Sequence, residues 1–454
     1  MATANTRGCI QAYGLGTHLV TFHSLVKEVH KLNDKLLSTL FIGIDVSLEK
    51  NHATALDFHE NLYLQMSFEN NVPGSDRFVQ AVVESLENFP FEHIIIGIES
   101  TSIYSTHIAS YLASNITLKA FDTKVYILNP KTTSGYRKTF VDLQKTDPTD
   151  SYLIADYARV GKIKTQPWKG DLHIALRRLT RHRLHIVELI TAEKTYYQTN
   201  LFLKFSEFAR LKGNKKLFSN KFGAVATAII EELLSLDDIA YMSVEDLAQL
   251  ISDKSKNHFA DPEIVAQKVQ AAARSSYRLD KSAYDPVTTA LASSLNLIKT
   301  YQAELKSIDK AIMKLIKGFQ NNAFISLTSI PGIGPVLAAG IIAEIGDIHC
   351  FKSNDALAKY AGITWSVNQS GPMKSDETRL TKRGNKYLRY YFMEAANSVR
   401  RYDPAYRSYY LSKFNEVHMH QHRRAVSLTS RKLIRLIFGL LIKNSQYVPD
   451  FSNE

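Results

Sequence analysis

Four acidic residues stand where their carboxylates could act together on one phosphate group. Asp45 and Glu99 each end a short apolar run, whereas Asp147 and Asp150 open a helical segment. Because Asp147 and Asp150 are three residues apart, they share one face of that helix. Converging carboxylates repel one another unless hard cations such as Mg²⁺ (or Mn²⁺) lie between them. The pattern therefore predicts a metal-dependent site for in-line displacement at phosphorus.

Each of these acids also has an ordinary structural explanation. A buried strand often ends in Asp merely because Asp caps the next turn or helix, and Asp147 is a suitable helix N-cap residue. The ordered set of four acids within one α/β pattern favours the metal-site interpretation over these alternatives.

The first predicted domain, residues 40–165, alternates short apolar runs with helical segments, which is typical of an α/β domain. Two amphipathic helices are predicted over residues 74–86 and 105–113. Three strands in a meander, followed by strand–helix–strand crossovers, is the order of a ribonuclease H-like (RuvC-like) domain. The predicted strands are Phe41–Asp45, Ala53–Phe58, Leu62–Phe68, Ile94–Ile98 and Lys124–Leu128.

A helical arm with an insert is predicted over residues 166–322. Long helices are expected over residues 172–208 and 286–319, and the second carries a sustained heptad of apolar residues. The insert between them, residues 214–284, has a mixed helical pattern without a chemical motif. We expect an antiparallel coiled coil that either packs within the monomer or joins subunits.

The C-terminal region, residues 323–443, is expected to be mainly α-helical and begins with a turn motif. Pro331-Gly332-Ile333-Gly334 is typical of a helix-hairpin-helix, in which Gly332 and Gly334 let the backbone approach a phosphate. The alternative is an ordinary Pro-Gly turn between helices.

The positive charge of the chain is concentrated in this region. Of a net charge of +12, residues 374–443 contribute 16 Lys/Arg against 5 Asp/Glu. A concentrated excess predicts a face that binds a polyanion, most simply nucleic acid. Seven tyrosines between Tyr387 and Tyr410 could stack on nucleobases or form a helical core. The candidate phosphate contacts, some of which are only solvated charge, are Lys374, Arg379, Lys382, Arg383, Lys386 and Arg389.

The cysteines and the longest apolar run bear on the compartment of the protein and on its association with membranes. Cys9 and Cys350 lie far apart and have no partners at metal-ligand spacing, which fits a reducing compartment and no zinc site. The longest apolar run, residues 433–442, is too short to cross a bilayer, and we find no secretion signal. We therefore expect a cytoplasmic protein, with residues 1–39 as an N-terminal extension and residues 444–454 as a tail.

Over residues 40–443 the chain resembles the DEDD-type transposases of bacterial insertion sequences, the insertion-sequence 110 family with its 1111 subgroup. The N-terminal half carries this resemblance through Gly43-Ile44-Asp45-Val46-Ser47, Gly97-Ile98-Glu99-Ser100-Thr101, Asn129-Pro130, and Lys145-Thr146-Asp147 with Asp150. The C-terminal half carries it through Pro331-Gly332-Ile333-Gly334, Tyr360-Ala361-Gly362-Ile363, Gln369-Ser370-Gly371, and Lys382-Arg383-Gly384-Asn385 with Leu388-Arg389. The chain departs from the family pattern in its longer N-terminal extension and in having Ser151 after the last acid.

The resemblance implies roles for these residues. Asp45, Glu99, Asp147 and Asp150 would be the divalent-metal ligands of a Holliday-junction-resolvase-like nuclease domain. Ser370 would be the nucleophile that attacks a DNA phosphodiester and forms a covalent phosphoserine. By itself, a Ser before Gly in a polar loop is typical of a turn. Residues 372–378 lack the glycines usual in the family, which leaves Ser366 and Ser375 as competitors.

The resemblance also implies partners and a reaction. The partners would be donor and target DNA, a structured guide (bridge) RNA, and further copies of the chain in a dimer or tetramer. The expected function is that of a transposase that moves its own element by site-specific recombination, with the serine and the acids meeting across subunits. Two alternatives stay open: a junction nuclease without covalent chemistry, and a non-catalytic nucleic-acid-binding scaffold.

Overall fold

Two compact units make up the chain in this computed structural model. Unit 1 comprises Met1–Ala175 and Ile345–Ala356, and unit 2 comprises Leu176–Glu344 and Leu357–Glu454. Most of the predicted N-terminal extension, residues 1–33, lies outside the described residues. The structure describes residues 34–449, except 87–88, 90, 101–102, 141–143, 145, 214–215, 219, 232–234, 257–258, 319–321, 366–368, 371–372 and 375–379.

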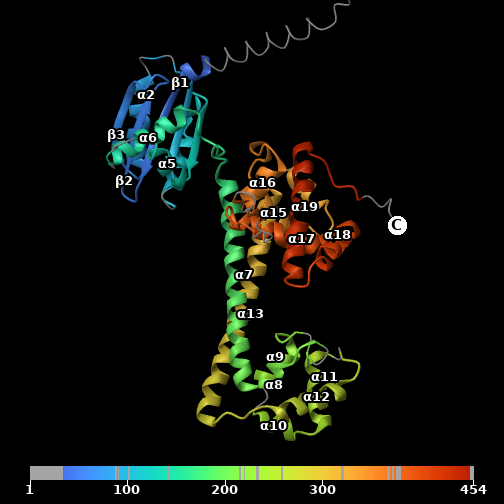
Figure 1. The fold of residues 1–454 in the computed structure, drawn as a ribbon. Helices are drawn as coiled ribbons and strands as arrows, with labels where there is room; N and C mark the ends of the chain where they lie inside the picture. Colours follow the sequence, from blue (N-terminus) through green and yellow to red (C-terminus); the bar gives the residue numbers. More distant parts are fainter. Residues whose placement is uncertain are drawn as a thin grey trace, which may run out of the picture. The chain divides into compact units, whose positions relative to one another are not determined.

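Unit 1 is built on a five-stranded sheet in the order β3-β2-β1-β4-β5 (Figure 1). Its strands are β1 Thr39–Val46, β2 Lys50–Leu56, β3 Leu62–Glu69, β4 His93–Glu99 and β5 Thr123–Leu128. The first three strands form an antiparallel meander, and β4 and β5 run parallel to β1. The predicted mixed α/β domain with a meander followed by crossovers is therefore confirmed.

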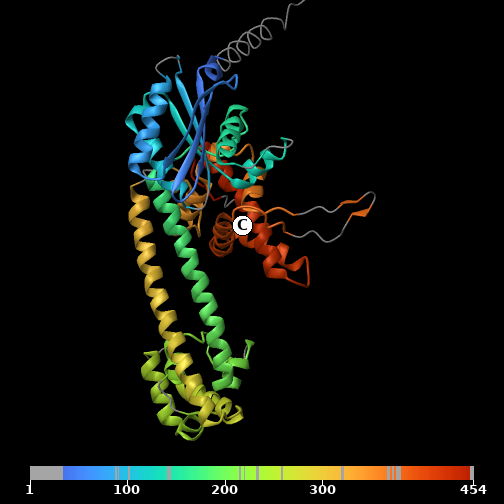
Figure 2. The same cartoon turned by 90° about the vertical axis from the view of Figure 1, so that its left-hand side faces the viewer.

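The helices of unit 1 lie on both faces of this sheet, with α2 and α6 on opposite faces in both views (Figures 1 and 2). Their bounds are α2 Val72–Leu86, α3 Ser105–Ser114, α4 Ile116–Lys119, α5 Pro130–Arg137 and α6 Asp147–Arg159, with a 3₁₀ turn at Ile348–Cys350. The period of two in a strand separates the two faces. In β1, Ile42 and Ile44 share a buried cluster with Phe78 of α2, whereas Gly43 meets the backbone of α6.

Gly43 and Gly97 are neighbours in the parallel β1–β4 register, and they form a matched pair for mutation. A Cβ atom at Gly43 would lie 2.2 Å from the backbone atoms Ala155 N and Ser151 O of α6. At Gly97 the nearest atom is a side-chain methyl of Ile154 at 3.1 Å. We expect Gly43→Ala to lower the free energy of unfolding by about 3 kcal/mol or more, because backbone cannot move aside, and Gly97→Ala by about 1 kcal/mol. Chemical denaturation measures both, and equal losses would contradict this account.

Two long helices dominate unit 2, α7 Asp171–Lys204 and α13 Lys281–Lys317, and they run side by side in both views (Figures 1 and 2). Arg183 of α7 forms an ion pair with Asp309 of α13 at 2.6 Å. Both helices also contribute to one apolar core, Tyr197 from α7 and Leu291 from α13. The predicted helical arm is thus present, and its two helices pack against each other within one chain.

Short helices form the insert between α7 and α13. They are α8 Ser206–Arg210, α9 Ala224–Glu231, α10 Leu236–Tyr241, α11 Val244–Ser255 and α12 Pro262–Ser275. Their buried residues join the core at the end of the arm, including Ile229, Leu247 and Val269. The insert is therefore a small helical subdomain.

The remaining helices are α14 Asn322–Thr328, α15 Pro335–Ile345, α16 Asn354–Ala361, α17 Lys386–Tyr402, α18 Pro404–Asn415 and α19 Gln421–Lys443. The predicted mainly α-helical C-terminal region is confirmed. Tyr391, Tyr406 and Tyr410 are buried, so for these three the helical-core interpretation holds, whereas Tyr402 is exposed. Among the described residues, no helix is both long and apolar enough to cross a membrane.

Candidate active site

The strand geometry of unit 1 explains why two of the acids come together. Asp45 and Glu99 each follow a glycine by two residues, so each shares the strand face that Gly43 and Gly97 turn toward α6. Because β1 and β4 are parallel neighbours, with Ile44 opposite Ile98, both carboxylates reach the same edge of the sheet. In each of the motifs Gly-Ile-Asp and Gly-Ile-Glu, the glycine allows α6 to pack closely on the strand. The acid two residues later points to the same face of the sheet as the glycine.

Asp147 and Asp150 reach the same edge because α6 begins there. Thr146 is the N-cap residue and Pro148 lies in the first turn. The ordinary explanation of Asp147 as an N-cap is therefore wrong. Further along α6, Asp156 accepts hydrogen bonds from Tyr136 at 2.6 Å and from Arg159 at 2.8 Å, which fixes the helix on unit 1. Burial, followed by the hydrogen bond to Asp156, raises the pKa of Tyr136, so this phenol stays a donor.

All four acids line one pocket of about 490 Å³ that lies wholly within unit 1. Helix α5 completes its wall with Thr133 and Arg137. The Asn129 side chain accepts from Lys131 N at 2.9 Å and Pro130 occupies the first turn, which sets the start of α5 directly after β5. The Asn-Pro motif therefore positions helix α5, which forms one side of the pocket.

The carboxylates of the pocket already have positively polarised partners. Arg137 forms an ion pair with Asp150, and the Thr133 hydroxyl donates to Glu99 Oε1 at 3.0 Å. His52, opposite Asp45 in the β1–β2 register, has its Nε2 atom 3.3 Å from Asp147 Oδ2. Asp45 also takes part in an interaction.

The pocket suits a metal ion in its donor chemistry but not in its present spacing. Carboxylates and a hydroxyl are the ligands that Mg²⁺ accepts. Within the part of the chain that the structure describes, however, no three His, Cys, Asp or Glu side chains are grouped tightly enough to hold a metal. The guanidinium of Arg137 supplies positive charge in this pocket.

Three pocket-wall or partner residues were missed from the sequence: His52, Thr133 and Arg137. His52 could have been found, because the short turn at residues 47–50 places it opposite Asp45. Thr133 and Arg137 fall four residues apart on one helix face, but nothing in the sequence says which face of α5 meets the acids.

Ser370 lies in unit 2, in the two-residue strand β6 Gln369–Ser370, which pairs antiparallel with β7 Met373–Lys374. Its backbone is thus extended rather than in a turn. Below this pair, Trp365 bridges Leu380 and Thr381 N donates to Thr364 O at 2.8 Å. The competing serines Ser366 and Ser375, and the candidate contact Arg379, lie outside the described residues.

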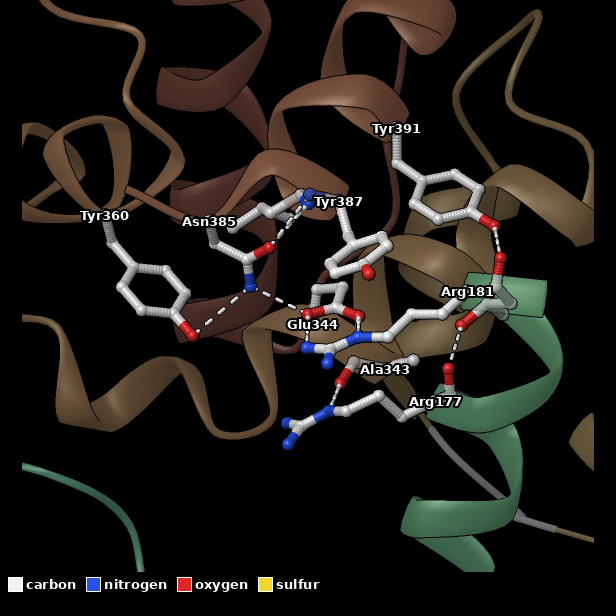
Figure 3. Close-up of polar contacts among 10 residues, drawn as sticks. Arg177, Arg181, Ala343, Glu344, Tyr360, Asn385, Tyr387 and Tyr391 are labelled. Atoms are coloured by element: carbon white, nitrogen blue, oxygen red, sulfur yellow. Dashed lines mark hydrogen bonds and ion pairs between the residues drawn. The ribbon is translucent and has the colours of Figure 1, made fainter. Parts of the chain in front are cut away.

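We call the β6–β7 pair, with the Trp365–Leu380 bridge at its base, the serine hairpin. The chain that follows this hairpin contacts the long helix α7 through a buried carboxylate. Asn385 caps α17 and donates through Nδ2 to Glu344 Oε2 at 2.7 Å (Figure 3). Arg181 of α7 donates to both oxygens of Glu344, at 2.7 and 2.9 Å, and stacks over Tyr387. Burial would lower the pKa of Arg181, but the hydrogen bonds and charge of Glu344 raise it overall. The arm and the stem of the serine hairpin therefore share one polar anchor.

We expect Glu344→Ala to lower the free energy of unfolding by about 3 kcal/mol, because it leaves Arg181 and Asn385 without their acceptor in a buried site. The matched control is Glu304→Ala, which removes an exposed carboxylate from α13 and is expected to change stability by less than about 0.5 kcal/mol. Chemical denaturation of each full-length variant measures the effect. Equal stability of the two variants would show that the anchor is not needed for the fold.

The basic residues singled out from the sequence differ in what they do. Arg389 donates to the backbone oxygens of Lys382 at 2.8 Å and Ala361 at 3.3 Å, so it fixes the turn before α17. Burial lowers its pKa. Lys382, Arg383 and Lys386 are exposed, and Lys374 lies in β7. Phosphate contacts by these residues stay a prediction.

The Pro331–Gly334 turn connects α14 to α15, as the predicted motif requires, but its two glycines have different surroundings. Gly332 has a φ of +96° and a Cβ there would come within 2.9 Å of the backbone of Val399 in α17. Gly334 is exposed, and a Cβ there would meet nothing within 4 Å. Gly332 is thus explained by packing, and Gly334 is the better candidate for a phosphate contact.

Comparison with known proteins connects both units to one family. A family model named DEDD_Tnp_IS110 and described as "Transposase" matches residues 42–205, and one described as "Transposase IS116/IS110/IS902 family" matches residues 326–411. The chain is 24% identical over 308 residues to an insertion element IS116 protein of Streptomyces clavuligerus, covering 67% of this chain and 73% of that protein. It is 24% identical over 342 residues to the mini-circle putative transposase for IS117 of Streptomyces coelicolor, covering 73% and 78%. It is also 24% identical over 414 residues to a pilin gene-inverting protein of Moraxella lacunata, covering 90% and 98%.

Proposed function

Because the chain belongs to the IS110/IS116/IS902 family of transposases, we propose that it cuts and rejoins DNA through a covalent bond to Ser370. The observation that carries the proposal is the pocket lined by Asp45, Glu99, Asp147 and Asp150 in a domain matched by the DEDD transposase model. In this proposal the four acids assist phosphoryl transfer by holding a metal ion, and the hydroxyl of Ser370 is the nucleophile.

The proposed chemistry balances without an added co-reactant. Ser370 Oγ attacks a DNA phosphorus, the bond from phosphorus to a deoxyribose oxygen breaks, and that oxygen leaves with a proton. The hydroxyl of another strand end then attacks the phosphoserine, which forms a new phosphodiester and restores the serine. The number of phosphodiester bonds is conserved, so no nucleotide cofactor is consumed.

The acid pocket is proposed to hold Mg²⁺ or Mn²⁺ through the same four carboxylates. Such an ion would stabilise the negative charge that develops on the phosphate oxygens and would favour the ionised form of the Ser370 hydroxyl. Arg137 would have to release Asp150 for that carboxylate to become a ligand. Thr133 would keep Glu99 oriented through its hydrogen bond.

Rejoining, rather than cutting alone, is favoured by one relative. The Moraxella lacunata protein, matched over nearly its whole length, is described as inverting a pilin gene. Inversion of a DNA segment requires that cut ends be joined again in a new order. This description of a relative supports recombination over the junction-nuclease alternative in our proposal.

Guidance by a structured RNA and assembly into a dimer or tetramer are part of the same proposal. The concentrated positive charge of residues 374–443 supports a large polyanionic partner in addition to a DNA site. Four strands are exchanged in such a reaction, so more than one active site is needed. A protein with this function would act in the bacterial cytoplasm and would associate with the nucleoid while acting.

The experiment that tests the proposal traps the intermediate. Purified protein is incubated with labelled element-end and target DNA in Mg²⁺, with and without RNA transcribed from the element's flank, and then denatured. We expect a DNA–peptide adduct whose attachment maps to Ser370, and its disappearance with EDTA. Cleavage in Mg²⁺ without any adduct would instead support the junction nuclease, and no activity under either condition would support the scaffold.

A further inference from the structure

A second pocket lies in unit 2, beside the base of the serine hairpin, and its lining includes none of the four acids. It has a volume of about 520 Å³ and lies between that base and helices α17 and α19. Pockets that hold small ligands have volumes of about 300 to 1,000 Å³. The space is therefore sufficient for one nucleotide.

The wall of this pocket is apolar on one side and contains an aromatic ring. Trp365 and Leu380, which pair at the base of the hairpin, lie near Met393 of α17 and Val426 of α19. Trp365 is only half-buried in the chain as it stands. An indole ring beside aliphatic side chains is a surface on which an unpaired nucleobase stacks.

The rim of the pocket is charged in the manner that a nucleotide requires. Lys382 and Arg423 are exposed at the rim and can contact a phosphate. Arg424 also lines the pocket, but its charge is balanced by Glu416 at 2.8 Å. Glu394, the acid among the described lining residues, can accept from the exocyclic amine of adenine or cytosine.

We propose that this pocket binds one unpaired nucleotide of the nucleic acid on which the protein acts, with its base against Trp365 and its phosphate at Arg423. The inference rests on the proposed function, because it assigns a substrate-positioning role beside the serine hairpin. A nucleotide held outside its helix at this point would keep the neighbouring strand single-stranded near the hairpin. DNA and RNA share this chemistry, and the test separates them.

The sequence offers a direct optical test. The chain contains two tryptophans, Trp168 and Trp365. In a Trp168→Phe background of the full-length protein, fluorescence therefore reports on Trp365 alone. The probes are a single-stranded oligodeoxyadenylate, the same oligomer in RNA, and an abasic oligomer of equal length and charge. We expect the base-bearing oligomers to quench Trp365 and the abasic oligomer to bind without quenching, and the more potent of the first two identifies the source.

A matched pair of charge variants tests the phosphate contact. Arg423→Ala should move the quenching midpoint to about tenfold higher oligomer concentration, because it removes about 1.4 kcal/mol of binding energy. Arg407→Ala removes the same charge from an exposed position on α18 outside the pocket, and should move the midpoint by less than about twofold. Equal shifts in the two variants, or equal quenching by the abasic oligomer, would overturn the inference.

The two proposals fail separately. If a Ser370 adduct forms but Trp365 is not quenched, only the nucleotide pocket is wrong. If Trp365 is quenched by base-bearing oligomers but no adduct forms on any serine, the proposed recombination chemistry is wrong and the pocket stands.

Discussion

Ser370→Ala is expected to abolish the protein–DNA adduct and to reduce strand exchange by at least about a thousandfold, because it removes the atom to which the phosphate is transferred. Binding of DNA should stay within about twofold of the parent, since one hydroxyl contributes little to an interface dominated by phosphate contacts. The adduct is read on denaturing gels after the reaction is stopped, and binding is read by fluorescence anisotropy. The split between lost chemistry and retained binding is the signature of a nucleophile.

Two neighbouring serines provide the controls for this variant. Ser366→Ala and Ser375→Ala remove hydroxyls from the same segment, on either side of the β6–β7 pair. We expect both to retain adduct formation. A persistent adduct in Ser370→Ala that disappears in Ser375→Ala would move the nucleophile to Ser375. Metal-dependent cutting that survives all three substitutions would instead identify a nuclease without covalent chemistry.

The acid pocket could be predicted because its parts follow from two simple periodicities. Alternation along a strand puts Asp45 on the face of Gly43, and Glu99 on the face of Gly97. Parallel pairing then brings both carboxylates to one edge of the sheet. The start of a helix supplies Asp147 and Asp150 together. Each step needs only local pattern and a common topology.

The rest of the pocket could not be predicted, because it depends on how elements rotate and dock. Arg137 enters the pocket only because α5 presents that face to α6. Arg389 belongs to a strongly basic helix and has the type of a phosphate ligand, yet its guanidinium is used on backbone oxygens of the preceding turn. The type of a residue indicates which groups it can bind, but only the folded structure shows which groups its side chain already contacts.

The serine hairpin shows a different limit. A strand of two residues, such as β6, has no periodicity to detect, so a polar loop was the expected structure. By contrast, the structure explains why glycines occur in the two family motifs that flank the hairpin, at residues 360–363 and 382–389. Gly362 and Gly384 have φ values of +70° and +138°, and a Cβ at Gly384 would lie 2.3 Å from Tyr360 O. The two motifs therefore pack directly against each other, which closes the stem of the hairpin.

Asp45→Asn is expected to weaken Mn²⁺ binding by at least about tenfold and strand exchange by at least about a thousandfold, because it removes one of four carboxylate charges while keeping the side chain's shape. Mn²⁺ binding is measured by electron paramagnetic resonance, which does not depend on activity. The control is Asp122→Asn, which removes a carboxylate on unit 1 that pairs with Lys35 and His93 outside the pocket. Equal Mn²⁺ affinity in the two variants would mean that the acid pocket is not a metal site.

Arg137→Ala is the counterpart of Asp45→Asn, with an expected effect of opposite sign on metal binding. The Arg137 guanidinium pairs with Asp150 inside the acid pocket, so an arriving cation must compete with it for that carboxylate. Removing the guanidinium leaves four carboxylates without this counter-charge, and Mn²⁺ should bind more tightly than to the parent. If Arg137→Ala instead weakened Mn²⁺ binding, the arginine would be a support that holds Asp150 in place rather than a competitor of the metal. The two variants together therefore decide whether charge in this pocket is arranged for a metal ion or for an internal ion pair.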